Sequence, residues 1–211
     1  MIKIATAECF TQGKIGREIH ALAQDYKGNF GLDYIKNPKE HGNFDYNELS
    51  VTCSLFIPTL EAVEKILSIS NPPKPNNLIK GIKVYDEEGD KNVSKIMARA
   101  IKKMSDCDIA IGTTAGVGHG GITILTNNYE ITTTSDVYAD LSKLNSEELS
   151  QRSESGIKKT LNILLLLLNN NFDKINNLKN VEIKGPAARR RQKKRGDTNP
   201  FTSSKTSPPV R

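Results

Sequence analysis

The sequence predicts an α/β fold, a three-layer αβα sandwich in which helices cover both faces of one mixed or mostly parallel sheet. The apolar run Ile2–Ala7 leads through a glycine-containing turn into Lys14–Tyr26, whose apolar residues have helical spacing. The helical stripe of Lys91–Met104 leads into the short apolar segment Cys107–Ile111, an order typical of parallel βαβ units. A chain of 211 residues is long enough for one such domain, which we place at residues 1–184.

Local signals assign the elements between the first helix and this stripe. Lys27–Asn47 predicts a long loop, and loops of that length are often functional. Leu49–Ile57 is rich in β-favouring side chains and predicts a strand, after which Pro58 suits the first position of a helix. Lys80–Tyr85 predicts a third strand, followed by an acidic turn at Asp86–Asp90. The residues of the helix after Pro58 that we expect to face inward are Leu60, Val63, Ile66 and Leu67.

The second half of the chain continues the pattern. Ile122–Thr126 predicts another strand. The next segment, Asn127–Ser135, is either a further strand or a polar rim of a pocket. A polar helix begins at Ser146 and continues through the leucine-rich segment Gly156–Leu168. We expect Asn169–Lys179, which is rich in Asn and Lys, to fray.

Positive charge is concentrated at the end of the chain. The formal net charge is +6, but residues 185–211 hold eight Lys or Arg and one acid, which leaves the preceding residues near neutrality. A near-neutral domain has no electrostatic footprint for nucleic acid, and no apolar run reaches the length of a membrane-spanning helix. The first residues have a strand pattern and no signal-peptide pattern. We expect residues 185–211 to be a basic, disordered tail; the alternatives are an arm for nucleic acid or an acidic partner, and a non-native end produced by a frameshift.

Cys9 lies at the carboxyl end of the first predicted strand. Ligands of open α/β sheets bind at that end, and free N–H groups at the start of the next helix favour a thiolate. The alternative is a small, inert buried cysteine. Cys9, Cys53 and Cys107 are widely spaced, which argues against a zinc site or a disulfide framework and favours a reducing cytoplasm.

The glycine-rich segment Gly112–Gly121 is the second candidate site. It leads into a strand and lacks the G-x-G-x-x-G spacing, so a Rossmann dinucleotide site is excluded. An anion-binding nest and a tight hairpin both remain open. His119 is the histidine best placed to face a ligand, but no Cys–His–Asp triad can be assembled around Cys9. That favours an acyl acceptor that receives a pre-activated substrate over a self-sufficient hydrolase.

The opening run from Ile2 to His20, IKIATAECFTQGKIGREIH, resembles the start of the archaeal HcgF family, which serves biosynthesis of the iron-guanylylpyridinol cofactor of [Fe]-hydrogenase. The resemblance extends from Met1 to about Leu168. It implies that the chain binds guanylylpyridinol and carries its carboxyl group as a thioester on Cys9. It also implies a partner enzyme, similar to ubiquitin-activating enzymes, that adenylates this carboxyl, and no metal or cofactor of the chain's own. Whether the chain forms a homo-oligomer is left open.

The segment Ala7–Gly13, AECFTQG, is similar to the Ala-Glu-Ser-Cys-Thr-Gly-Gly motif of the CinA C-terminal and nicotinamide mononucleotide deamidase family. Cys9 stands in place of that family's nucleophilic serine, and the glycine-rich segment is similar to its nucleotide-pocket loop. This likeness implies a CinA C-terminal-like fold and leaves two alternatives, a pyridine-nucleotide amidohydrolase and a non-enzymatic nucleotide-binding protein. The residues that we predict to bind the ligand around Cys9 are Glu8, Thr11, Gly13, Thr113, Thr114, Gly116, Gly118, His119 and Gly120.

Strand alternation points Glu8 away from the face that Cys9 occupies, so we expect Glu8 to orient the backbone or a ligand rather than to act as a base.

Deleting residues 185–211 should leave folding and ligand binding unchanged, because a segment this charged and poor in large apolar residues buries little area. Thermal unfolding of the full-length and truncated chains tests this. A large loss of thermal stability on truncation would show that the tail docks on the domain.

Overall fold

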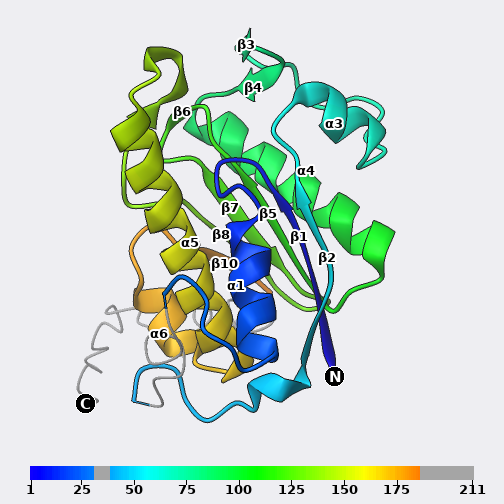
Figure 1. Cartoon of the computed structure of the whole chain (residues 1–211), viewed down its shortest axis with the longest axis vertical. Helices are drawn as coiled ribbons and strands as arrows, with labels where there is room; N and C mark the ends of the chain where they lie inside the picture. Colours follow the sequence, from blue (N-terminus) through cyan, green and yellow to red (C-terminus); the bar gives the residue numbers. More distant parts are fainter. Residues whose placement is uncertain (31–38, 186–211) are drawn as a thin grey trace, which may run out of the picture.

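The computed structural model describes residues 1–30 and 39–185, and it has helices on both faces of one six-stranded sheet (Figure 1). The strands of this sheet are β1 (Ile2–Glu8), β2 (Leu49–Phe56), β5 (Ile109–Thr114), β7 (Gly121–Leu125), β8 (Glu130–Thr133) and β10 (Glu182–Lys184). Their order is β10-β8-β7-β5-β1-β2. β1 runs parallel to β2 and β5, whereas β7, β8 and β10 pair antiparallel. The sheet is therefore mixed, and the predicted three-layer α/β class is confirmed.

Each face of the sheet has its own apolar core. The helices are α1 (Lys14–Ala23), α3 (Leu60–Lys65), α4 (Glu87–Ser105), α5 (Ser146–Leu168) and α6 (Phe172–Asn177). The first core joins α1, α5 and α6 to one face, and the second joins α3 and α4 to the other. Strand alternation separates them, because Ile4 of β1 belongs to the first core and Ala5 and Ala7 belong to the second.

The helix α4 begins earlier than the sequence predicts. The side chain of Asp86 accepts the N–H of Gly89 at 2.8 Å and caps the helix, so the predicted acidic turn at Asp86–Asp90 is wrong. Acidic residues in a first helical turn are stabilised by the helix dipole, which explains the composition of this segment.

The predicted strand at Lys80–Tyr85 also differs. Its core, β4 (Ile82–Val84), pairs with β3 (Asn77–Ile79) and makes a single bridge from Ile82 to Thr59, and β3 and β4 form a separate hairpin beside the main sheet. The predicted strand Lys80–Tyr85, the helix Lys91–Met104 and the strand Cys107–Ile111 therefore do not form a βαβ unit of the main sheet. The parallel connections of the main sheet are instead β1 to β2 through α1, and β2 to β5 through α4.

Three other expectations are corrected. Thr59 caps α3 by accepting the N–H of Ala62 at 3.1 Å, so Pro58 precedes the helix instead of opening it. Ile66 is 50% exposed, because α3 ends before it. Residues 169–179 do not fray throughout, since they include α6 with its fully buried Ile175.

The remaining elements are short. They are β6 (Val117–Gly118), β9 (Ala139–Asp140) and the 3₁₀ turns η1 (Tyr46–Glu48) and η2 (Leu141–Lys143). Residues 127–135, left open by the sequence, contain β8, which lies inside the sheet between β7 and β10. Within the described residues, no helix has the length and apolar character needed to cross a membrane. The predicted tail lies, apart from Gly185, outside the described residues, as does part of the predicted loop at Lys27–Asn47.

Gly112→Ala should destabilise the fold by about 3 kcal/mol or more, because α4 packs directly on the backbone of β5. A Cβ at Gly112 would lie 2.2 Å from the carbonyl oxygen of Ser94 and 2.7 Å from the nitrogen of Ala98, both in α4. Denaturant unfolding measures the change. The control is Gly81→Ala, where φ is +80° but the nearest atom is 3.5 Å away, so only about 1 kcal/mol is expected. Equal losses in the two variants would contradict this packing.

Candidate functional site

Cys9 follows β1 directly, and its backbone fixes it beside the carboxyl end of β5. Its N–H donates to the carbonyl oxygen of Thr113 at 2.9 Å and to the hydroxyl of Thr113 at 3.2 Å. The turn then passes through Gln12 and Gly13, whose φ angles are 58° and 74°. The thiol is thus held at the sheet edge where α/β proteins bind ligands.

The side chain of Cys9 lines a small, mainly apolar cavity of about 140 Å³. The described residues around it are Cys9, Phe10, Gln12, Phe56, Pro58, Ile82, Ala115, Leu141, Leu149 and Arg152. None of these is a His, Asp or Glu, and Arg152 is the one charged residue among them. An apolar protein cavity of about 150 Å³ is known to bind benzene. The cavity therefore suits one six-membered aromatic ring, and a larger ligand would extend beyond it.

Glu8 is fully buried, and its carboxylate binds the start of α1. One oxygen accepts the N–H of Gly16 at 2.9 Å and the hydroxyl of Thr6 at 2.8 Å. The other accepts the N–H of Ile15 at 3.1 Å and the hydroxyl of Thr11 at 2.7 Å. Burial raises the pKa of Glu8, and these hydrogen bonds oppose the rise. Glu8 thus orients the backbone, one of the two roles predicted for it.

The first turn of α1 offers Cys9 none of the free N–H groups that the sequence led us to expect. Glu8 occupies the N–H groups of Ile15 and Gly16, while that of Lys14 donates to the carbonyl oxygen of Thr11 at 3.0 Å. The expectation that this helix start favours the thiolate is therefore wrong. A buried carboxylate satisfies the donors that would otherwise face an anion.

The glycine-rich segment is a hairpin loop between β5 and the antiparallel β7. Two of its amides already bind carboxylates of α4: the N–H of Gly116 donates to Asp90 at 2.7 Å and that of His119 to Glu87 at 3.3 Å. The loop has a left-handed φ of 120° at Gly118. The hairpin interpretation is confirmed, and in this conformation these two amides are not available to a phosphate.

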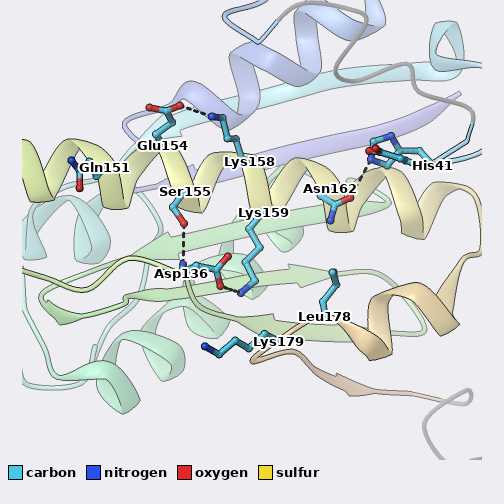
Figure 2. A pocket seen from close by; sticks show the side chains of 11 residues that line it. His41, Asp136, Gln151, Glu154, Ser155, Lys158, Lys159, Asn162, Leu178 and Lys179 are labelled. Carbon is cyan, nitrogen blue, oxygen red and sulfur yellow. Dashed lines mark hydrogen bonds and ion pairs between the residues drawn. The ribbon is translucent and has the colours of Figure 1, made fainter.

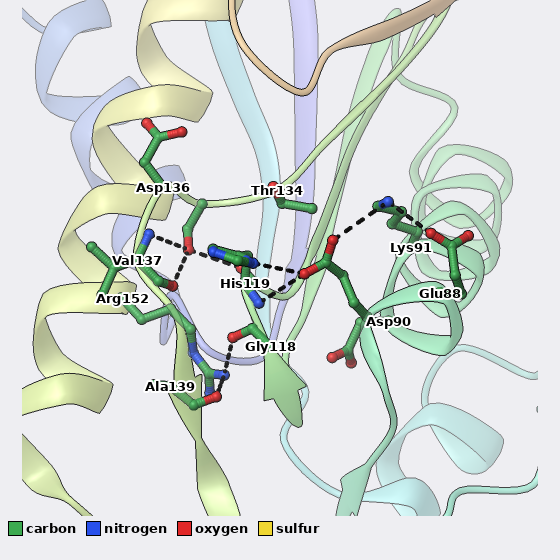
Figure 3. Close-up of polar contacts among 12 residues, drawn as sticks. Glu88, Asp90, Lys91, Gly118, His119, Thr134, Asp136, Val137, Ala139 and Arg152 are labelled. Atoms are coloured by element: carbon green, nitrogen blue, oxygen red, sulfur yellow. Dashed lines mark hydrogen bonds and ion pairs between the residues drawn. The ribbon is translucent and has the colours of Figure 1, made fainter.

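Arg152 of α5 binds the backbone of this loop (Figure 3). One guanidinium nitrogen donates to the carbonyl oxygens of Gly116, Gly118 and Ala139 at 3.1, 3.0 and 2.8 Å. Arg152 is 1% exposed, and burial lowers its pKa. Its Nε is buried without a hydrogen-bond partner, and its guanidinium lies 5.8 Å from the ring centre of Phe10. Arg152 therefore joins the loop to the cavity of Cys9.

His119 pairs with Glu87 of α4. Its Nδ1 lies 2.7 Å from the Glu87 carboxylate, and its ring packs edge-on against Tyr138 at 5.8 Å between centres. Partial burial raises the pKa of Glu87, but the hydrogen bonds from His119 outweigh it and the net shift is downward. His119 is not among the residues that line the Cys9 cavity, so the structure does not bring it to the thiol.

A larger groove of about 690 Å³ runs along α5 away from Cys9 (Figure 2). Its walls carry ion pairs and hydrogen bonds, such as Lys159 to Asp136 at 2.6 Å and His41 to Asn162 at 3.1 Å. Its charges are largely paired within the protein. Among the described residues, no group of three His, Cys, Asp or Glu side chains is arranged to hold a metal ion.

Comparison with known proteins decides the family. The model of the HcgF family, described as FeGP cofactor biosynthesis protein HcgF, matches residues 1–168. The chain belongs to the HcgF family. A UPF0254 protein of Methanothermobacter thermautotrophicus (strain Winter) is 43% identical over 164 residues, covering 78% of this chain and 94% of that protein. A UPF0254 protein of Methanococcus maripaludis (strain S2) is 38% identical over 175 residues, covering 82% and 99%. The family places this HcgF-like chain in cofactor biosynthesis, with relatives in methanogens.

The HcgF family's opening motif and the glycine-rich segment meet in space through buried hydroxyls. The hydroxyls of Thr11 and Thr113 are 2.8 Å apart, so the two predicted blocks form one unit. Thr114 is also fully buried, and Gly13 opens α1 with free space beside it. Ligand binding by these residues, and by Gly116, Gly118, His119 and Gly120, stays a prediction.

Several residues of the site were missed from the sequence. The apolar wall of the cavity comes from Phe56, Ile82 and Leu149, which belong to three separate elements. Only the tertiary fold brings them together, so no local pattern marks them. Arg152 did carry a signal, because it interrupts α5 as one of only three arginines before residue 185. Lys83 carried a weaker sequence signal, because it is a charged residue inside a short apolar strand.

Asp90 should make the stability of the protein depend on pH. It is fully buried, one carboxylate oxygen has no hydrogen-bond partner, and burial raises its pKa to about 7. Because the folded pKa lies above the unfolded one, the stabilisation is present below about pH 4 and is lost as pH rises through about 7. The upper limit of this pH-dependent contribution to the unfolding free energy is about 4 kcal/mol.

Asp90→Asn should therefore remove most of the fall in unfolding free energy between pH 5 and pH 8, as measured by denaturant titration. Asp86→Asn serves as the control, since asparagine caps a helix as well as aspartate does and should keep the wild-type pH dependence. The same pH dependence in wild type and Asp90→Asn would refute the role given to Asp90.

Proposed function

We propose that this HcgF-family chain binds guanylylpyridinol and receives its activated carboxyl group as a thioester on Cys9. The observation that carries the proposal is the position of the Cys9 thiol in the wall of an apolar cavity sized for one aromatic ring. The pyridinol ring would occupy the cavity between Phe10 and Phe56. The guanylyl part, too large for this space, would extend outside it.

The chemistry follows from what surrounds the thiol. The described residues lining the cavity include no His, Asp or Glu that would act as a general base. A cysteine without a base needs an acyl donor with a good leaving group. We therefore assign the activation step to a partner enzyme that adenylates the carboxyl group of the pyridinol.

In the transfer step, Cys9 loses its proton and its sulfur attacks the carbonyl carbon of the acyl adenylate. The carbon–sulfur bond forms, the bond from carbon to the phosphate oxygen breaks, and AMP leaves with the bonding electron pair. The products are the Cys9 thioester, AMP and one proton, so no oxidant or reductant is required. The thioester keeps the acyl group activated for a later step.

Cys9→Ala should keep the fold, bind ligand and form no adduct when incubated with adenylated guanylylpyridinol. Cys9→Ser should behave in the same way, because a hydroxyl ionises far less readily than a thiol and no base is present. Intact-mass spectrometry measures the adduct, which hydroxylamine should release from the wild type. Cys53→Ser and Cys107→Ser are matched controls and should acylate normally. An adduct of the same mass in Cys9→Ala would exclude this assignment.

A further inference from the structure

Lys83 is a buried cation next to Cys9 that the proposed reaction has not yet used. It belongs to β4 and is 0% exposed. Its ammonium donates to the carbonyl oxygens of Ile57 at 3.0 Å and of Pro58 at 3.2 Å. Among the described residues, no carboxylate lies within ion-pair distance of it.

The link to Cys9 is a shared oxygen atom. The thiol of Cys9 contacts the carbonyl oxygen of Pro58 at 3.9 Å, and the ammonium of Lys83 binds that same oxygen. Pro58 and its neighbour Ile82 both line the cavity, so the strand that carries Lys83 also forms part of the wall. The ammonium and the sulfur therefore contact one carbonyl oxygen, at 3.2 and 3.9 Å from it.

A buried ammonium is costly to the fold. Moving such a charge out of water costs several kcal/mol, and well-packed apolar replacements of buried ions are often neutral or stabilising. Hydrogen bonds to two carbonyl oxygens offset only part of this desolvation cost, since these oxygens carry partial charges. Lys83 is therefore better explained by an anion that it meets during function than by a contribution to stability.

The other charges near the cavity do not supply this anion. Arg152 is a second buried cation, and its guanidinium is bound to three carbonyl oxygens. Asp90 is the nearby carboxylate, but with a pKa of about 7 it is only partly ionised at neutral pH. The start of α1, which would otherwise stabilise an anion, is occupied by Glu8. Two buried cations thus lie at the cavity, whose described lining contains no carboxylate.

We propose that Lys83 is a positioning residue that holds Cys9 in its thiolate form, so that the ammonium supplies the stabilisation that the helix start cannot. A thiolate has no proton to donate to the carbonyl oxygen of Pro58, so ionisation releases this contact while the Lys83 ammonium stays bound to the same oxygen. A unit charge within a few ångströms is worth enough at protein dielectrics to shift the thiolate population severalfold to a hundredfold. The inference rests on the proposed function for the use made of the thiolate, but the inference itself concerns Cys9 before any acyl group is bound.

The test is the rate at which iodoacetamide alkylates Cys9 at pH 7, followed by peptide mass spectrometry with Cys53 as the internal reference. Lys83→Gln keeps a hydrogen-bond donor but loses the charge, and it should slow alkylation of Cys9 about tenfold. Lys83→Arg keeps the charge and should stay within about threefold of the wild type. A purely structural role would instead be rescued by glutamine as well as by arginine.

Lys102→Gln is the matched control. Lys102 also donates to two carbonyl oxygens, those of Cys107 and Asp108, but at the amino end of β5, away from Cys9. This variant should leave the alkylation rate of Cys9 unchanged. Wild-type reactivity of Cys9 in a folded Lys83→Gln would overturn the proposal.

A second measurement needs no variant and so does not depend on folding. A cation beside the thiolate should raise the rate with anionic iodoacetate relative to neutral iodoacetamide, and this ratio should be higher at Cys9 than at Cys53. Equal ratios at the two cysteines would also overturn the proposal. Neither measurement uses the pyridinol, so Lys83-dependent alkylation without any acyl adduct would refute the proposed function and leave this inference standing.

Discussion

The buried carboxylate of Glu8 is the interaction on which the geometry of the site depends. It accepts two N–H groups from the first turn of α1 and two threonine hydroxyls, and it thereby fastens the end of β1 to the start of the helix. The Cys9 turn lies between these two anchored points. The hydroxyl of Thr11, bonded to Glu8, also meets that of Thr113, which accepts the Cys9 N–H. One buried charge thus positions the thiol through a continuous set of hydrogen bonds.

This arrangement determines how the site treats negative charge. In many α/β proteins a helix start faces the ligand and stabilises an anion. Here the protein's own carboxylates occupy these donors: Glu8 binds the start of α1, and Asp90 and Glu87 bind two amides of the glycine-rich hairpin loop. Positive charge reaches the cavity from side chains instead, Lys83 from one side and Arg152 from another. The result is an apolar cavity with one cation, Arg152, in its wall and a second, Lys83, bound to the carbonyl oxygen of the lining residue Pro58, which suits acyl transfer from a charged, pre-activated donor.

The sequence was sufficient for the fold class and for the thiol, because both have local signals. Strand and helix periodicities revealed the layers, and the AECFTQG motif placed Cys9 at the end of β1. Two of the errors concern local structure that the residue pattern did not reveal. β3 and β4 pair with each other across Lys80 and Gly81, and Asp86 caps α4, so an apparent turn is a helix start. The fraying expected at Asn169–Lys179 was wrong because the core buries Ile175.

The sequence predicted only part of the site, because the rest is formed by residues that lie far apart in the chain. The residues of the two motifs are adjacent along the chain and could be named. The cavity wall is assembled from β2, β4, α5 and the connections between them, and no spacing rule joins these segments. Glu8 was named from its motif, and in this structure its carboxylate binds backbone N–H groups and threonine hydroxyls of the protein itself.

The most direct measurement of the central claim is a crystal structure of the chain after incubation with adenylated guanylylpyridinol. Our account predicts continuous electron density from the sulfur of Cys9 to the carbonyl carbon, with the pyridinol ring inside the cavity between Phe10 and Phe56 and the guanylyl part outside it. A ring bound elsewhere, with an unmodified Cys9 in an empty cavity, would contradict the account.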